Sequence, residues 1–198
     1  MNAPEEPTFY SANDARTAVA EILSEWFDSG KPGECRRVFV GRWIAVEDIS
    51  LALVPYHEEA LRLSLYAEEV TALLTGLRTQ YKAATSKLVM RVLRYIASNF
   101  PQPAKDSFQY WLSTAYFNQV INLSLLETSK IKLEGILYPS VQMKYHGDSV
   151  ALFPSVVDQR LRFIDAQELA FGRLEGGHIW MCGKPPLWFA KRSRRFGF

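Results

Sequence analysis

Near its start the chain changes from a strand-like to a helix-like pattern. Residues 8–11 favour a strand, and Asn13 or Asp14 can cap the helix that follows. The apolar positions of that helix recur at helical spacing: Ala18, Val19, Ile22, Leu23 and Trp26. The pattern predicts a short strand and then an amphipathic helix, which the turn-forming residues 28–33 bring to an end.

Strand-like segments lie on both sides of the middle of the chain. Before it, 37–45 and 49–54 have strand character, and we expect them to be neighbours in a meander. After it, five short apolar runs have the same character: 133–138, 149–153, 161–164, 169–173 and 179–182.

The middle of the chain is helical. One helical pattern covers 56–77 and ends near Gly76, a stronger one covers 82–100, and a third covers about 106–126. Strands, then helices, then strands predict an α+β fold with mixed, largely antiparallel sheets and a helical middle. No segment reads as a linker, so we expect 1–198 to form a single domain.

The composition excludes several classes of protein. Hydrophobic residues make up 48% of the 198 residues and charged residues 22%, as in a soluble globular protein. No apolar run approaches the roughly 20 residues of a membrane span, and the acidic, proline-bearing opening is not a secretory signal peptide. Cys35 and Cys182 are too few for a disulfide scaffold or a four-ligand zinc site. We expect a cytoplasmic protein that holds no metal and binds no membrane.

The net charge of +2 gives no general reason for a polyanionic partner. The basic tail 191–198 is the exception, with four cations and no acidic residue. Such a tail is more often a solvated terminus than a nucleic-acid contact, so we expect no direct binding of nucleic acid. The chain also lacks a Walker loop and a Rossmann fingerprint, and its three histidines show no metal-ligand spacing. Whether it forms a homo-oligomer stays open.

Three segments, read together and in order, resemble one family. They are FYSANDARTAVAE at 9–21, GILYPSV at 135–141 and GDSVALFP at 147–154. The combination resembles the RES domain, which is named for an arginine, a glutamate and a serine. The similarity covers roughly residues 7–155, and the last forty or so residues match less well.

The resemblance implies a fold related to ADP-ribosyltransferases and a site for NAD as substrate. Members of the family are toxins of bacterial toxin–antitoxin pairs that destroy NAD, some of them by phosphorolysis. Their partner is an antitoxin with a DNA-binding region that covers the active site. Carried onto this sequence, the NAD-binding residues are Tyr10, Glu21 and Ser140, of which Glu21 and Ser140 are the catalytic pair.

The chemistry of these residue types fits the resemblance. Breaking the nicotinamide–ribose bond builds positive charge on the sugar, which a carboxylate such as Glu21 stabilises while it holds a ribose hydroxyl. Tyr10 can stack on nicotinamide and bond the ligand through its hydroxyl. Ser140 follows a strand and can bond the ribose or the carboxamide. It need not be a nucleophile, because no His or Asp lies at the spacing of a triad.

The sequence departs from the family at the arginine, which lies upstream of the tyrosine strand. Only nine residues precede Tyr10 and none is arginine. Either the natural protein begins further upstream, which we expect, or this form lacks a working dinucleotide clamp. Arg42 lies downstream of Glu21 and is not assigned the phosphate-clamping role of that arginine. The leading hypothesis is an NAD-cleaving toxin. The alternatives are transfer of ADP-ribose to a protein and a non-catalytic partner-binding protein on the same fold.

Overall fold

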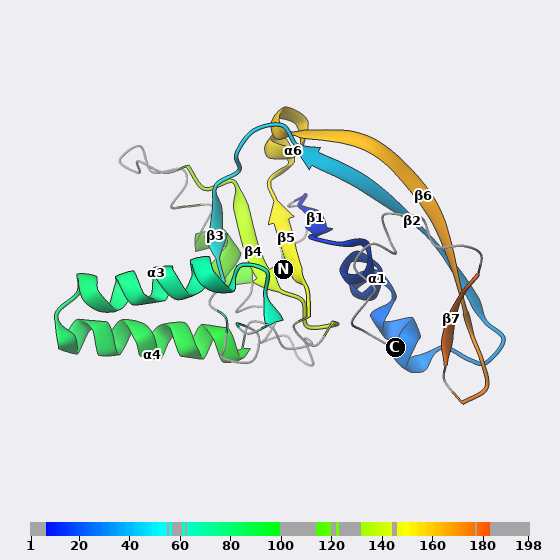
Figure 1. Ribbon diagram of the computed structural model, residues 1–198, viewed down its shortest axis with the longest axis horizontal. Coiled ribbons are helices and arrows are strands. Elements are labelled where there is room, and N and C mark those ends of the chain that lie inside the picture. Colours follow the sequence, from blue (N-terminus) through cyan, green and yellow to red (C-terminus); the bar gives the residue numbers. More distant parts are fainter. Residues whose placement is uncertain are drawn as a thin grey trace.

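The computed structural model describes residues 7–54, 56, 61, 63–99, 114–119, 122, 132–143, 146–176 and 178–182. They form a four-stranded sheet, a three-stranded sheet and a set of helices, and helix α1 lies between the two sheets (Figure 1). The α+β class predicted from the sequence is confirmed at this level. None of the described helices is both long enough and apolar enough to span a bilayer.

The four-stranded sheet is mixed and has the order β1-β5-β4-β3. Strand β5 pairs antiparallel with both β1 and β4, whereas β3 pairs parallel with β4. The buried apolar residues of this half gather in one cluster: Val54, Phe117, Ile136, Tyr138 and Ala151. The strands are β1 (Phe9–Ala12), β3 (Leu51–Leu53), β4 (Gly135–Pro139) and β5 (Asp148–Leu152).

The three-stranded sheet is antiparallel, with the order β2-β6-β7, and its two long strands arch over α1 (Figure 1). Its strands are β2 (Cys35–Ala45), β6 (Leu161–Arg173) and β7 (Ile179–Cys182). The expected meander of 37–45 with 49–54 is wrong, because these segments lie in different sheets. The two strands expected at 161–164 and 169–173 are one continuous strand, with a bulge at Ile164.

Helix α1 (Ala15–Ser29) begins where the sequence predicts. The Asp14 carboxylate accepts hydrogen bonds from the backbone N–H groups of Arg16 and Thr17, which are otherwise unpaired at a helix start. One face of α1 packs on the long strands in a second core: Val19, Leu23, Trp26, Val38, Val40, Leu169 and Phe171. The sequence analysis also placed Ile22 on this face, but its side chain is 64% exposed.

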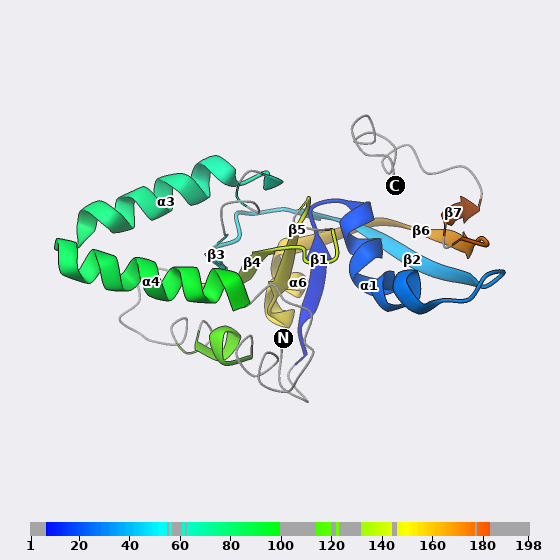
Figure 2. The ribbon, with the colours of Figure 1, turned by 90° about the horizontal axis from the view of Figure 1, so that it is seen from below.

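Helices α3 (Ala67–Gln80) and α4 (Ala83–Asn99) form a hairpin that extends from the body in both views (Figures 1 and 2). Of the helix expected at 56–77, the described residues 61 and 63 are helical, and the chain turns at 64–66. Helix α3 then begins at Ala67 and continues past Gly76, where the helix was expected to end. Helix α6 (Pro154–Arg160), which opens on a proline, was not predicted.

Some predicted features lie partly or wholly outside the described residues. Of the third predicted helix, 106–126, the described part at 114–119 is helical. The basic tail 191–198 and His57 lie outside the described part of the chain, as does the side chain of Cys182. The Cys35 thiol is free and exposed.

Candidate functional site

Glu21 projects from α1 toward the four-stranded sheet, away from the core that α1 shares with the long strands. Its Oε1 accepts a hydrogen bond from the Ser140 hydroxyl at 2.5 Å and a longer one from the Ser149 hydroxyl at 3.4 Å. The other carboxylate oxygen, Oε2, accepts no hydrogen bond from the described residues. Both serines are almost fully buried. One oxygen of the carboxylate is therefore held in place, while the second has no hydrogen-bond partner among the described residues.

The serines owe their positions to the ends of two paired strands. Ser140 directly follows β4, and its backbone N–H donates to the carbonyl of Gly147 at 2.8 Å. Ser149 lies in β5 directly opposite Tyr138 of β4. Since side chains directly opposite in a sheet share one face, Ser149 and Tyr138 point to the same side, toward α1. The antiparallel pairing of β4 with β5 thus brings both serines to one carboxylate.

Tyr10 and Tyr138 complete the cluster. Tyr10 of β1 pairs with Ala151 of β5 and is 44% exposed, so its ring is accessible from solvent. Tyr138 is buried, and its pKa is raised by burial and by the nearby charges of Glu21 and Tyr10. The Tyr138 hydroxyl consequently keeps its proton at neutral pH and can act as a donor. We call Tyr10, Glu21, Tyr138, Ser140 and Ser149 the glutamate cluster.

Burial also acts on the carboxylate of Glu21. It raises the pKa of Glu21 above its ordinary value of 4.5, and the hydrogen bonds from Ser140 and Ser149 oppose this rise without cancelling it. Raised carboxyl pKa values occur at functional sites and also in buried structural networks. The shift at Glu21 reflects the partly buried position of its carboxylate.

Asp148, the neighbour of Ser149, anchors the cluster from behind. Its buried carboxylate accepts hydrogen bonds from the Tyr56 hydroxyl at 2.7 Å, the Ser64 hydroxyl at 2.9 Å and the Leu65 N–H at 3.1 Å. Its backbone carbonyl also accepts from the N–H of Asn13 at 3.0 Å. One residue thereby ties β5 to the turn before α1 and to the segment that leads into α3.

Gly147 is required next to this anchor because α1 passes very close. A Cβ at Gly147 would lie 2.1 Å from the Thr17 hydroxyl oxygen, which is closer than atoms can approach. Thr17 is fully buried, and its hydroxyl donates to the Asp14 carboxylate at 3.0 Å. Three consecutive residues therefore have different roles. Gly147 allows α1 to pass close by, Asp148 anchors β5, and Ser149 donates to Glu21.

The structure brings together the three residues that the sequence singled out. Glu21 and Ser140 are hydrogen-bonded, and Tyr10 lies at the same cluster. Ser149 and Tyr138 were missed, although both fall inside the segments that carry the resemblance. Their alternation with Ala151 and Ile136 along paired strands is the signal that could have placed them beside Ser140.

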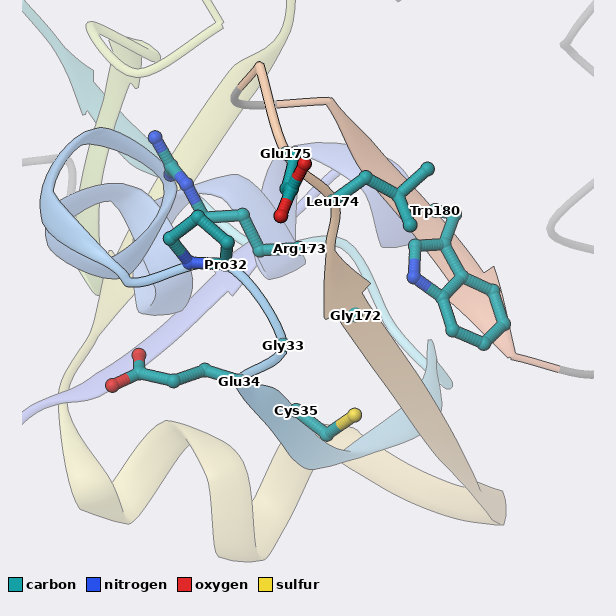
Figure 3. A pocket seen from close by; sticks show the side chains of 9 residues that line it. All are labelled: Pro32, Gly33, Glu34, Cys35, Gly172, Arg173, Leu174, Glu175 and Trp180. Carbon is teal, nitrogen blue, oxygen red and sulfur yellow. The ribbon is translucent and has the colours of Figure 1, made fainter.

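A separate pocket of about 380 Å³ lies where β2 begins and β6 ends (Figure 3). Two of its charged groups, Arg173 and Glu34, are engaged within the protein. Arg173 donates to the carbonyls of Trp26 and Phe27 at the end of α1, and Glu34 accepts from the Trp26 indole at 2.9 Å. The pocket does not include Glu21 or Ser140. The hydrogen bonds of Arg173 and Glu34 stabilise the end of α1.

Arg42 forms an ion pair with Asp165 on the neighbouring strand at 2.6 Å and is not part of the glutamate cluster. Within the described ranges, no group of three or more His, Cys, Asp or Glu residues comes close enough to hold a metal ion.

Comparisons with known proteins do not assign the chain to a family. No family model, curated protein or solved structure matches the chain. The similarity to the RES domain therefore rests on the three sequence segments, and the function on the chemistry that the glutamate cluster can perform.

Proposed function

We propose that the chain cleaves the nicotinamide–ribose bond of NAD in the manner of RES-type toxins, with phosphate or water as the acceptor. The observation that carries this proposal is the carboxylate of Glu21, whose Oε1 is held by two buried serines while Oε2 accepts no hydrogen bond from the described residues. A fixed carboxylate with one free oxygen is what a developing positive charge on a sugar requires.

The reaction balances with groups that the proposal names. The electron pair of the bond between C1′ and the ring nitrogen leaves with nicotinamide, which becomes neutral, and C1′ becomes positive. The Glu21 carboxylate stabilises that charge, and Oε2 accepts a hydrogen bond from a ribose hydroxyl. An oxygen of phosphate or water then bonds to C1′. When water is the acceptor, its proton is released to solvent.

The other members of the cluster have supporting roles in this proposal. The exposed ring of Tyr10 stacks against nicotinamide. Ser140 orients Glu21 and does not act as a nucleophile, because its hydroxyl already donates to the carboxylate. The Tyr138 hydroxyl is hydrogen-bonded to Ser149, so Tyr138 supports one of the two serines that hold Glu21. The ADP-ribosyltransferase-like fold, a cytoplasmic location and an antitoxin that covers the cluster belong to the same proposal.

The test is to incubate the purified chain with NAD and phosphate and to follow nicotinamide by chromatography. Glu21→Gln should reduce nicotinamide release by at least about a hundredfold, the usual effect of losing one transition-state charge partner. Glu25→Gln is the matched control, since Glu25 lies one turn further along α1 and is exposed. Its release should equal that of the parent.

Three outcomes would overturn the proposal in different directions. Release that needs an added protein, with ADP-ribose bound to that protein, would identify a transferase. NAD binding without release would identify a non-catalytic binding protein on the same fold. Release that survives Glu21→Gln would remove Glu21 from the chemistry.

A further inference from the structure

Helix α4 carries an apolar row on its solvent side. Leu88, Val92 and Tyr95 follow one another at spacings of four and three residues, so they lie in line along one face. Their side chains are 60%, 49% and 51% exposed. The row covers about 10 Å of the helix axis at the usual rise per residue. Apolar side chains aligned in this way indicate a surface that another molecule covers.

A cationic row runs beside the apolar one. Lys87, Arg91 and Arg94 repeat the same spacing one position earlier, and all three are exposed. Helix α4 contains no Asp or Glu, and these cations form no ion pair with a carboxylate among the described residues. The positive charge along this edge of α4 is therefore not neutralised within the described part of the protein.

We propose that this face of α4 binds an acidic amphipathic helix of a partner protein. In paired helices, apolar rows meet along the seam and charged rows at its edge choose the partner. Carboxylates on the partner would pair with the row at Lys87, Arg91 and Arg94, while its apolar side chains cover the row at Leu88. The hairpin extends from the body in both views (Figures 1 and 2), and the side chains of both rows are exposed.

An acidic helix fits the face better than an anionic membrane does. Helices that lie on membranes usually carry cations on both flanks of the apolar face. In α4 the cations lie on one flank of the apolar row. The other flank holds half-buried apolar residues, among them Leu93 and Ile96. The neighbouring helix α3 also places the exposed carboxylates of Glu68 and Glu69 on the same hairpin, where an anionic bilayer would repel them. This proposal does not depend on the chemistry of Glu21.

The probe is a fluorescein-labelled helical peptide of about 20 residues, long enough to form stable turns on binding. It carries leucine at i, i+4 and i+7 with glutamate beside each leucine. Fluorescence anisotropy with the full chain should show binding that weakens by about tenfold between roughly 50 and 200 mM salt. A peptide with lysine in place of each glutamate should not bind.

Variants of the chain locate the binding face. Arg91→Glu should weaken peptide binding at least about tenfold, because a like charge then faces the peptide. Leu88→Ser tests the apolar row separately and should weaken binding without changing its salt dependence. Arg37→Glu is the control, since this exposed cation lies on β2. Its binding should match that of the parent.

Two results would overturn the proposal. One is the absence of binding to the acidic peptide at low salt, or binding that Arg91→Glu leaves unchanged. The other is that the chain sediments with phosphatidylserine vesicles and ignores the peptide, because the face would then serve a membrane. Circular dichroism of each variant shows whether the helices remain folded.

Discussion

The Ser140 hydroxyl donates to Glu21 Oε1 across 2.5 Å, although the two residues are 119 positions apart in the chain. One comes from a helix near the start of the chain and the other from the end of β4. Their contact exists only when α1 packs against the four-stranded sheet. The integrity of the site is therefore a direct report on the tertiary structure, and its physical consequences can be measured without knowing the ligand.

The first prediction concerns pH. Folding raises the pKa of Glu21 above 4.5, so between that value and the folded pKa the folded chain holds a proton that the unfolded chain has lost. The free energy of unfolding should then fall as pH rises through this window and stay constant above it. Glu21→Gln keeps the hydrogen-bond acceptor and removes the charge. It should be more stable than the parent at pH 7 and equal to it in acid.

Urea unfolding from about pH 4 to pH 8 measures this difference. Glu25→Gln, which changes an exposed carboxylate on the same helix, should show the pH profile of the parent. If Glu21→Gln is less stable than the parent at pH 7, the serine hydrogen bonds outweigh the cost of burying the charge, and the direction of the shift is wrong.

The second prediction concerns the close contact between Gly147 and Thr17. Gly147→Ala places a methyl group on the buried Thr17 side chain, which cannot move away because Asp14 holds its hydroxyl. We expect a loss of about 1–3 kcal/mol in the free energy of unfolding. Gly76→Ala is the matched control, since a Cβ there meets open space inside α3. It should stabilise by about 0.5–1 kcal/mol.

Both effects can be read from chemical denaturation. A Thr17→Ala change in the Gly147→Ala background removes the side-chain atoms that clash, so it should recover part of the stability. A double variant no better than the sum of its single changes would show that the contact is not the cause.

The third prediction concerns Asp148. Asp148→Asn replaces one carboxylate oxygen by a donor, which then faces other donors among Tyr56, Ser64 and Leu65. Leaving buried groups unpaired should cost about 2–4 kcal/mol. Asp158→Asn alters an exposed carboxylate in α6 and should cost less than about 0.5 kcal/mol. Equal stability of the two variants would show that Asp148 is not an anchor.

Local patterns predict the elements of this fold better than they predict its pairings. The start of α1 follows from Asp14, and the ends of β4 and β5 from apolar runs, because these signals lie within a few residues. Which strands pair depends on distant segments. Residues 49–54 look like the next strand of a meander, yet β3 pairs with β4, more than eighty residues later.

Polar residues divide the apolar pattern of β6. Asp165 and Glu168 interrupt its apolar pattern, and the sequence therefore reads as two short strands. In the structure both residues pair with arginines of β2, Asp165 with Arg42 and Glu168 with Arg37, on a ribbon that is largely exposed. Cross-strand ion pairs of this kind are visible only once the partner strand is known.

The site shows the same division between local and distant information. Glu21 and Ser140 could be chosen because the segments around them resemble a family pattern. Asp148 could not, because an aspartate at the start of a strand is ordinarily exposed. Its role depends on Tyr56 and Ser64, whose positions are set by the approach to α3, and no local signal reports that approach.

Helix α1 contacts the two sheets with opposite sides. Leu23 faces the three-stranded sheet, while Glu21, two residues earlier, faces the four-stranded sheet. Each added residue turns a helix by about 100°. A single insertion between Thr17 and Glu21 would thus turn Glu21, Leu23 and Trp26 together away from their contacts. If these three residues kept their places, the insertion would instead displace Thr17 and the Asp14 cap at the start of the helix. The contacts with both sheets therefore fix the rotation of α1 about its own axis. New specificities would have to arise by changing the side chains around the helix and not by altering its length.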